Sequence, residues 1–591
     1  MRIRPVLAAV TVLLAAALAA ACSGRERAEA SMEPSGARDV IVHLFAWPWA
    51  SVAGECTRVL GPKGYGGVQV SPPQEHVVLP GKGYPWWQDY QPVSYRLTSR
   101  RGDREAFAAM VRACHAAGVK VYADAVVNHM AGGASTGPGS GGSAYSQYAY
   151  PAVPYGDGDF HHCGRNGTDD IADWGDRWEI QNCELVDLSD LRTESPYVRG
   201  KLVAYLDDLV SLGVDGFRVD AAKHLSAADL AAVVDAVRGD PYVYSEVIEG
   251  GAGEPGPEEY TGIGAVTEFR YGDVVGGAFR DGKLSGLRDL ATRMRVGSGD
   301  AVAFVDNHDT QRTGRASLTY RDGAPYALAE AFMIAWPYGV PQVMSSFTFG
   351  DPEAGPPTAG DGTTTAVSCG DGWQCEHRWR TTANMVALRT TAAGAPVTHW
   401  WSNGTDQIAF GRGGAAYVAF NRSGAALTRT FQTSLPAGGY CDVMAGDFSA
   451  GTCTGPAYTV DASGRVTATV PAGAALALHA GARVGPATPV PACASAPVTF
   501  AVTVTTTWGQ NVFVTGDTAG IGGWNPAAAV PLSAAAYPVW RATVTLPGAT
   551  TVQYKYLEKE GSTVVRESGA NRVRTTAAAG PCGATWQDTW R

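Results

Sequence analysis

Three acidic residues directly follow short apolar runs in this sequence, where buried strands would end. Asp220 ends the run Gly-Phe-Arg-Val-Asp, Glu246 ends Val-Tyr-Ser-Glu, and Asp309 ends Phe-Val-Asp-Asn-His-Asp. Such residues need a partner or a function, because an unpaired charge is costly to bury. Two carboxyl groups that face one bond can cleave a glycoside, one as nucleophile and one as proton donor. Solvent or a helix face would explain any one residue, but three successive strand ends indicate a shared pocket.

A basic residue lies within the first of these motifs. Arg218 is two residues before Asp220, so both side chains project from the same face of a strand. A neighbouring guanidinium favours the ionised carboxylate, which a nucleophile requires. The carboxyl group that donates the proton needs the opposite perturbation, since a general acid must hold its proton, and a partly buried apolar site would raise its pKa.

The elements that must position these residues alternate between strand and helix. The segment 103–118 predicts a helix that stops at a glycine, and 196–212 predicts another. Alternation over ~350 residues indicates a (β/α)8 TIM barrel, whose C-terminal strand ends build the active site. A long irregular stretch indicates a lobe inserted at about 129–190. The predicted barrel strands cover residues 40–45, 66–71, 119–127, 214–219, 242–245, 301–305 and 340–345.

Length and composition indicate several globular domains. The chain has 591 residues, 45% of them hydrophobic and 17% charged, which excludes a disordered chain. The formal net charge of −10 argues against nucleic acid as a partner. We predict the barrel at 39–392, a β-sandwich domain at 393–480, a linker at 481–491 and a small all-β domain at 492–591.

The N-terminus is typical of an export signal. Arg2 and Arg4 precede an apolar run at 6–21 that is short for a transmembrane helix. Cys22 follows Leu-Ala-Ala-Ala as in a bacterial lipoprotein, and 22–38 would be a tether. Ordinary signal cleavage, which leaves Cys22 unmodified, is the alternative. We favour export with a lipid on Cys22, because 11 cysteines are an odd number and ten would remain to pair.

Four ordered motifs resemble the conserved regions of the α-amylase family of glycoside hydrolases. They are DAVVNH at 124–129, GFRVDAAKH at 216–224, SEVIE at 245–249 and FVDNHD at 304–309. The resemblance covers roughly 39–480 and is closer to the animal and actinobacterial members, through VHLFAWPW, PWWQDYQPVSYRL and PYGVPQVMSS. It implies a retaining mechanism with three catalytic residues: Asp220 as nucleophile, Glu246 as acid/base, and Asp309 holding the sugar hydroxyls.

The resemblance also implies a set of sugar-binding residues. Trp86, Trp87 and Tyr90 would form a stacking platform, because the apolar face of a sugar packs on aromatic rings without needing charge. Lys223 and His224 would serve the leaving-group side. The complete implied set is Trp86, Trp87, Tyr90, Gln91, His129, Arg218, Lys223, His224 and His308.

A calcium ion that pins the inserted lobe to the barrel is implied as well. Calcium takes oxygen ligands. The side chains of Asn128 and Asp190 and the backbone carbonyls of Gln181 and His224 match the family pattern, with Asp187 as a rival for Asp190.

The chain departs from the chloride-activated relatives at one position. Those relatives surround the anion with two arginines and an asparagine; Arg218 and Asn307 are present here, but Gln342 stands in place of the second arginine. A neutral amide supplies no positive charge. We therefore expect activity that does not require chloride.

The last hundred residues resemble a family 20 starch-binding module, through VFVTGDTAGIGGWN, VQYKYLEKE and TWQDTWR. Arg566 stands where a second tryptophan is expected in one of its two sugar sites, which would weaken that site. The resemblance implies Trp524, Lys555 and Asn571 in this site, and Trp508, Tyr537 and Trp540 in the other.

These observations predict an exported, monomeric enzyme that cuts internal α-1,4 bonds of starch, glycogen and maltooligosaccharides. The alternatives are an exo-acting maltooligosaccharide-forming amylase, a transglycosylase, and a non-catalytic surface protein that captures starch. Cys493 and Cys582 bracket the last domain, so we expect them to pair, and the family pattern implies four more disulfides: Cys56–Cys114, Cys163–Cys183, Cys369–Cys375 and Cys441–Cys453.

Overall fold

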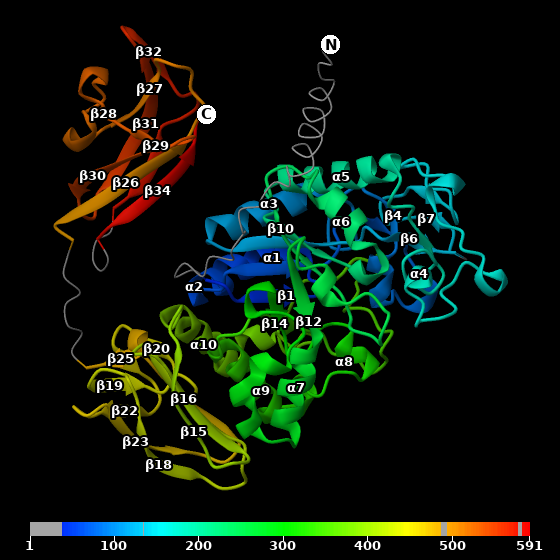
Figure 1. Ribbon diagram of the computed structural model, residues 1–591, viewed down its shortest axis with the longest axis horizontal. Coiled ribbons are helices and arrows are strands. Elements are labelled where there is room, and N and C mark those ends of the chain that lie inside the picture. Colours follow the sequence, from blue (N-terminus) through cyan, green and yellow to red (C-terminus); the bar gives the residue numbers. More distant parts are fainter. Residues whose placement is uncertain (1–37, 134, 486–492, 577–581) are drawn as a thin grey trace, which may run out of the picture. The chain divides into compact units, whose positions relative to one another are not determined.

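The computed structural model describes residues 38–133, 135–485, 493–576 and 582–591 (Figure 1). The expected signal peptide at 1–21, Cys22, all but the last residue of the tether, and the linker residues 486–491 lie outside these residues. The chain divides into two compact units, 1–485 and 486–591. Within the described residues, no helix has the length and apolar character needed to cross a membrane.

Eight parallel strands close into a barrel, which confirms the predicted fold class (Figure 1). Neighbouring strands follow the order β1-β14-β13-β12-β11-β10-β5-β2. The strands are β1 (Ile41–Leu44), β2 (Gly67–Val70), β5 (Lys120–Ala125), β10 (Gly216–Val219), β11 (Tyr242–Ser245), β12 (Ala265–Glu268), β13 (Ala301–Ala303) and β14 (Val340–Ser345).

One of these strands, β12, was not among the predicted ones. Its four residues, Ala-Val-Thr-Glu, include a single strongly apolar side chain, so the local pattern is too short and too weak to indicate a strand. It is a strand because it fills the gap between β11 and β13 and pairs with both. Closure of the barrel, a tertiary constraint, decides its conformation.

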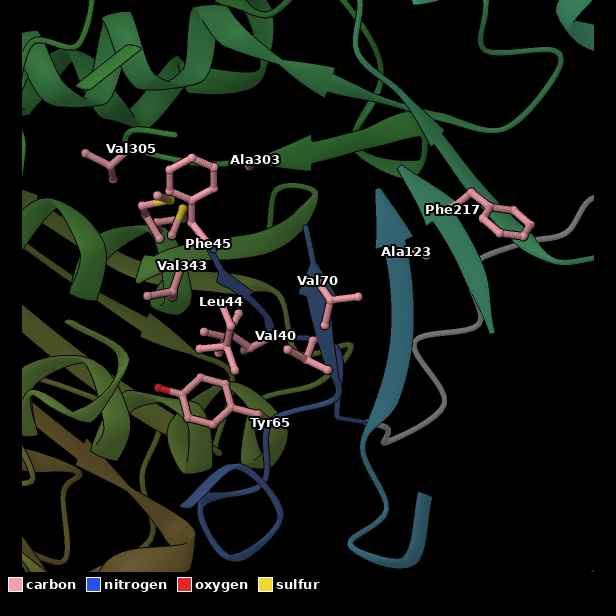
Figure 2. Close-up of a cluster of buried hydrophobic side chains, with 14 of the residues drawn as sticks. Val40, Leu44, Phe45, Tyr65, Val70, Ala123, Phe217, Ala303, Val305 and Val343 are labelled. Carbon is pink, nitrogen blue, oxygen red and sulfur yellow. The ribbon is translucent and has the colours of Figure 1, made fainter. Parts of the chain in front are cut away.

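Helices surround the barrel, and apolar side chains fill the space between helices and strands. Figure 2 shows this core, to which Val40, Leu44 and Phe45 contribute from β1 and its flanks. Asp103 caps α3 by accepting a hydrogen bond from the Ala106 amide, as an N-cap residue does. The longer helices are α1 (Trp49–Glu55), α3 (Arg104–Ala116), α5 (Pro196–Ser211), α6 (Ala227–Val234), α7 (Phe269–Arg280), α9 (Ala324–Ala335) and α10 (Arg380–Thr391).

The inserted lobe leaves the barrel after β5 and returns before α5. Its first strand β6 (His129–Gly132) pairs with its last strand β9 (Leu188–Asp190), and His129 lies opposite Asp190. Between them lie β7 (Gly137–Pro138), β8 (Ala144–Tyr145) and α4 (Arg177–Ile180). The pairing brings both ends of the lobe back to the C-terminal edge of the barrel.

The rest of the first unit is a two-sheet β-sandwich. One sheet has the order β15-β16-β17-β24 and the other β18-β23-β22-β19-β25. The strands are β15 (Val397–Ser402), β16 (Gln407–Arg412), β17 (Ala416–Asn421), β18 (Leu427–Gln432), β19 (Gly438–Cys441), β22 (Ala457–Val460), β23 (Arg465–Val470), β24 (Ala474–His479) and β25 (Arg483–Val484). Arg412 holds the sandwich to the barrel domain by donating to the carbonyls of Ala335 and Ala392.

The second unit is all β, as predicted. It has one sheet of order β29-β30-β26-β34 and another of order β28-β27-β31-β32, in which β33 also pairs with β31. The strands are β26 (Ser495–Thr503), β27 (Asn511–Gly516), β28 (Val530–Pro531), β29 (Ser533–Ala536), β30 (Val539–Pro547), β31 (Thr551–Glu560), β32 (Thr563–Arg566), β33 (Arg572–Thr575) and β34 (Ala584–Thr589). All five implied disulfides are present in the two units.

Candidate active site

The ends of three adjacent barrel strands bring the charged residues together. In the register of the sheet, Arg218 on β10 lies beside Asp124 on β5. On the other side, Val219 lies beside Ser245 of β11. Asp220 and Glu246, the next residues of β10 and β11, therefore stand next to each other at the C-terminal edge, where barrel enzymes place their chemistry.

Arg218 is the centre of this cluster. Its side chain is 3% exposed. One terminal nitrogen lies 2.8 Å from Asp124 Oδ1 and 2.6 Å from Asp220 Oδ1, and the other lies 2.5 Å from Glu246 Oε1. A single guanidinium thus holds the two predicted catalytic carboxyl groups. The second oxygen of Glu246 accepts a hydrogen bond from the Ala221 amide at 3.1 Å.

Burial sets the protonation of both carboxyl groups. Burial raises the pKa of Glu246, and the ion pair with Arg218 opposes this rise. A raised pKa is what a general acid requires. Burial also raises the pKa of Asp220, again against the effect of Arg218. Arg218 therefore acts on Asp220 in the expected direction, but desolvation outweighs it in this arrangement.

Asp309 and His308 approach the cluster from the segment after β13. Asp309 is half-buried and lies 3.4 Å from the ring of His308, measured from Oδ2 to Nε2. Burial, followed by the negative charge of Glu246, raises the pKa of Asp309 well above its usual range. The side-chain oxygen of Asn307 accepts hydrogen bonds from the amides of Asp309 and Thr310, which fixes the turn that carries Asp309.

Aromatic rings line the same edge. Tyr90 stacks on His308 with centroids 5.2 Å apart, and its hydroxyl donates to Asp124 at 2.9 Å. Trp86 meets His308 edge to face, and its indole N–H donates to the Pro352 carbonyl. Trp86 is partly exposed, as a stacking platform must be, whereas Tyr90 is 7% exposed and serves mainly to hold His308 and Asp124.

Trp87 and Gln91 extend from the same segment toward other partners. Trp87 is partly exposed and donates its indole N–H to the Glu353 carboxylate. Gln91 accepts a hydrogen bond from the Gly132 amide at 3.2 Å. Gln91 therefore joins the platform segment to the inserted lobe.

The two remaining histidines are neutral hydrogen-bonding groups. Burial lowers the pKa of His129 to about 4, and its Nε2 lies 2.9 Å from the Tyr90 carbonyl. Burial likewise lowers the pKa of His224 to about 4, and its Nδ1 lies 2.9 Å from the Ile180 carbonyl. Imidazoles that stay neutral suit contacts with uncharged sugar hydroxyls.

Lys223 lies beside His224 and faces the loop after β11. Its Nζ is 2.5 Å from Glu254 Oε2. Trp174 of the inserted lobe meets His224 edge to face and is 48% exposed. This side of the site is therefore formed jointly by the barrel and the lobe.

The implied calcium ligands lie on both sides of the barrel–lobe junction. The amide of Asn128 contacts Asp190 Oδ1 at 3.2 Å, and both residues are buried. Burial raises the pKa of Asp190 to about 7. The Gln181 amide donates to the Leu225 carbonyl at 3.2 Å, which brings Gln181 beside the segment of His224. Asp187, the rival ligand, is exposed.

The donor chemistry of this set fits a hard cation. The ligands would be one carboxylate, one amide and two backbone carbonyls, all oxygen donors. Among the described residues, no group of three or more His, Cys, Asp or Glu could hold a metal ion. A site with a single acidic residue is compatible with that finding, because the amide and the two backbone carbonyls would supply the other oxygen ligands.

Gln342 belongs to a neutral network inside the barrel. Its amide donates to Gln69 at 2.8 Å and lies 3.2 Å from the Tyr244 hydroxyl. Gln69 in turn donates to Asp124 at 3.3 Å. The Gln342 side chain is thus bonded to an amide and a hydroxyl group, and through Gln69 it is linked to Asp124.

In the second unit, the structure corrects one predicted sugar contact. Trp540 is 5% exposed and packs in the hydrophobic core, so its ring presents no face to a sugar. The pattern of exposed and buried residues along β30 places it inside. Trp508 is fully exposed and Tyr537 is 51% exposed, and the Tyr537 hydroxyl lies 3.3 Å from the Thr506 amide.

The residues predicted for the other sugar site of this unit are Trp524, Lys555 on β31, and Asn571. Trp524 is partly exposed and has a left-handed backbone (φ 63°). Lys555 donates to the carbonyls of Glu567 and Gly569, and Asn571 donates to Gln553 at 3.1 Å. Arg566 is exposed on the edge strand β32.

Several residues of the site were not predicted. Asp124 opens the motif DAVVNH and is an acidic residue near the end of the apolar strand β5, so the pattern that identified Asp220 could have found it. Gln69, Tyr244, Trp174 and Glu254 carry no such local signal, because their positions depend on which strands and loops become neighbours.

Three family models match the chain. "Alpha amylase, catalytic domain" matches residues 68–246, "Alpha amylase, C-terminal all-beta domain" matches 400–481, and "Starch binding domain" matches 495–585. These matches fall on the barrel with its lobe, on the sandwich and on the second unit.

Similar proteins span either the whole chain or its first unit. An alpha-amylase of Streptomyces violaceus is 48% identical and covers 97% of each chain. An alpha-amylase of Tribolium castaneum is 45% identical over 72% of this chain and 90% of its own. The crystal structure of alpha-amylase I from Eisenia fetida superposes with a TM-score of 0.72 and 39% identity, covering 75% of this chain and 97% of that one.

Proposed function

The chain belongs to the α-amylase family and hydrolyses starch, and from this premise we propose how its residues act. Asp220 is the nucleophile, Glu246 the acid/base, and Asp309 the carboxylate that binds the sugar at the cleavage point. The observation that carries this assignment is the shared contact of Asp220 and Glu246 with one buried guanidinium. A retaining mechanism requires these two carboxyl groups to lie about 5–5.5 Å apart.

In the first step, Asp220 Oδ attacks the anomeric carbon while Glu246 gives its proton to the leaving glycosidic oxygen. The C–O bond to the leaving chain breaks as the bond to Asp220 forms. In the second step, Glu246 takes a proton from water, whose oxygen attacks the same carbon and releases Asp220 as carboxylate. Two displacements leave the anomeric configuration unchanged.

A timed product analysis on soluble starch tests this function, with proton NMR of the first products. We expect internal cuts to give a spread of oligosaccharides. The new reducing end of these products should first appear in the α anomeric configuration. Products in the β configuration would contradict the nucleophilic role of Asp220, and one dominant short product would indicate exo action. The crystal structure of an Eisenia fetida amylase variant is described as a maltohexaose complex, which supports an oligosaccharide of that size as substrate.

We further propose that Asn128, Asp190 and the carbonyls of Gln181 and His224 hold calcium. The ion would neutralise the buried Asp190 carboxylate and join the lobe to the barrel. Removal of calcium with EDTA is expected to lower the melting temperature, because a ligand at 100 times its Kd stabilises by about 2.7 kcal/mol.

Two aspartate variants make this calcium prediction specific to the site. Asp190→Asn should abolish the effect of EDTA on melting, whereas Asp187→Asn should keep it. A melting temperature of the unaltered protein that EDTA leaves unchanged would refute the proposal.

Chloride is not needed in the proposed mechanism. Gln342 is bonded to Gln69 and Tyr244, and its neutral amide supplies no second positive charge. We expect enzyme dialysed against chloride-free buffer to keep its full kcat/KM on maltooligosaccharides. A large rise on adding sodium chloride, but not sodium sulfate, would contradict this expectation.

The starch-binding module would keep the enzyme on polymer or granules. Exposed Trp508 and Tyr537 supply aromatic faces for one sugar site, and Trp524, Lys555 and Asn571 lie in the region of the other. A tethered second site raises the local substrate concentration without changing the chemistry. The five disulfides are typical of an oxidising compartment, which supports export; a lipid on Cys22 belongs to the same proposal.

A further inference from the structure

A buried arginine outside the assigned set lies one helical turn after Asp309. Arg312 belongs to the short helix α8 (Thr310–Thr313) and is 7% exposed. One terminal nitrogen donates to the His308 carbonyl at 2.7 Å. Its Nε and its other terminal nitrogen are buried and have no hydrogen-bond partner among the described residues. Arg218 differs, because it is paired with three carboxylates.

Four aromatic rings enclose the Arg312 guanidinium. Its central carbon lies 5.0 Å from the ring centroid of Phe45, 5.4 Å from Trp86, 4.9 Å from Phe347 and 4.3 Å from Phe349. Ring faces attract a cation and replace part of its lost hydration. The enclosure holds the charge in one place without neutralising it.

The walls of this enclosure are shared with the sugar site. Phe45 packs on His308 with centroids 4.9 Å apart, and Trp86 meets both Phe45 and His308 edge to face. Arg312 therefore touches, directly or through one ring, the stacking platform and the histidine beside Asp309.

Several charged groups act on the Asp309 carboxylate, and Arg312 is one of them. Glu246 and Asp220 repel its negative charge, while Arg218 and Arg312 attract it. His308, 3.4 Å away, is neutral because burial and Arg218 lower its pKa. Arg218 is the larger of these two attractive charges, but its guanidinium is also bonded to three other carboxylates, and Arg312 adds a second positive charge that none of them binds. Burial lowers the pKa of Arg312 only to about 10, so it stays charged at neutral pH.

We propose that Arg312 is a positioning residue of the starch-cleaving site, which favours the anionic form of Asp309 and holds His308 in place for the sugar ring at the cleavage point. It acts through Asp309, His308 and Trp86, and it does not touch the scissile bond. The inference rests on the proposed role of Asp309. A lysine could supply the charge, but its compact ammonium lacks the planar fork that stacks among four rings while donating to a carbonyl.

The pH dependence of kcat/KM on a soluble maltooligosaccharide tests this proposal, in the full chain. Arg312→Met removes the charge and the hydrogen bond. Arg312→Gln removes the charge but keeps an amide donor toward His308. We expect both variants to move the acid limb upward by about one pH unit, because Asp309 then holds its proton to higher pH. Arg312→Lys should leave the limb in place and lower kcat/KM through weaker positioning.

The matched control is Arg321. Its guanidinium lies 4.1 Å from the same Phe349 ring, and it donates to the Phe349 carbonyl. Unlike Arg312, it is exposed and lies outside the helix that follows Asp309. Arg321→Met should leave the acid limb unchanged. The proposal would be overturned if the acid limb of the pH profile did not shift in either Arg312→Met or Arg312→Gln, whatever their activity. It would also be overturned if the acid limb of Arg312→Lys shifted as far as in those two variants. Should Arg312→Met fail to fold, Arg312→Gln and Arg312→Lys still give opposite predictions.

The outcomes also separate this proposal from the proposed catalytic roles. If Asp309→Asn kept full activity, the role of Asp309 itself would be wrong. If Asp309→Asn were inactive while the limbs of the neutral Arg312 variants did not move, only the role of Arg312 would fail.

Discussion

Glu246→Gln is expected to lower kcat on soluble starch by about 10²–10⁴-fold, the usual contribution of a general acid–base residue. The amide has nearly the same shape as the carboxyl group and can still accept from the Ala221 amide. It has no proton to give to the leaving oxygen, so the bond cleavage loses its acid. Adsorption to starch granules, measured by depletion from solution, should remain because the binding module is unaltered.

Glu249→Gln is the matched control for that variant. Glu249 lies three residues further along the same segment and pairs with Arg270 and Arg295 on the outside of the cluster. Its loss should leave kcat nearly unchanged. Full activity of Glu246→Gln would show that another group is the acid, and loss of granule binding would show that the change had damaged the fold.

Arg218→Met is expected to destabilise the barrel by about 3–5 kcal/mol, the cost of removing one partner of a buried ion pair. The change leaves Asp124, Asp220 and Glu246 buried together without their common cation. The midpoint of urea unfolding should fall, and hydrolysis should be lost because the nucleophile is no longer held or ionised. Arg270→Met, which breaks a partly exposed pair with Glu249, should cost no more than about 1 kcal/mol.

The destabilisation by Arg218→Met should depend on pH with a definite sign. Without the guanidinium, the folded-state pKa values of the three buried carboxyl groups rise further above their unfolded values. The native state then binds more protons than the unfolded state, so the free energy of unfolding falls as pH rises. We expect the free energy of unfolding of the variant to be closest to that of the unaltered protein near pH 4 and furthest below it near pH 8. A deficit that is the same at both pH values would contradict the ion-pair explanation.

Much of the fold was predictable from local pattern, and the exception shows why. Seven barrel strands have apolar runs that are long enough to predict a strand, and each run is bounded by a glycine, a polar residue or a helix. β12 has no such run, and only its pairing with β11 and β13 in the closed barrel identifies it as a strand. The two ends of the inserted lobe were predicted from irregular composition, but the pairing of His129 with Asp190 was not.

The candidate site was predictable to the extent that strand ends identify it. Asp220, Glu246 and Asp309 follow strands, and a closed parallel barrel brings such residues to one edge. The hydrogen bond of Gln91 to the lobe, the burial of Tyr90 and the burial of Trp540 were not predictable, because exposure depends on partners distant in the sequence.

By itself, the sequence determined the alternation of strands and helices, the acidic residues that end three strands, and the cysteines that form five disulfides. The tertiary structure alone decided that one guanidinium binds Asp124, Asp220 and Glu246 together. It also decided that Arg312 lies among four aromatic rings with no carboxylate partner in the described part of the chain. The physical reason is that local sequence sets backbone conformation and side-chain chemistry, whereas desolvation and charge pairing, which fix the protonation of a catalytic group, are summed over neighbours that only folding brings together.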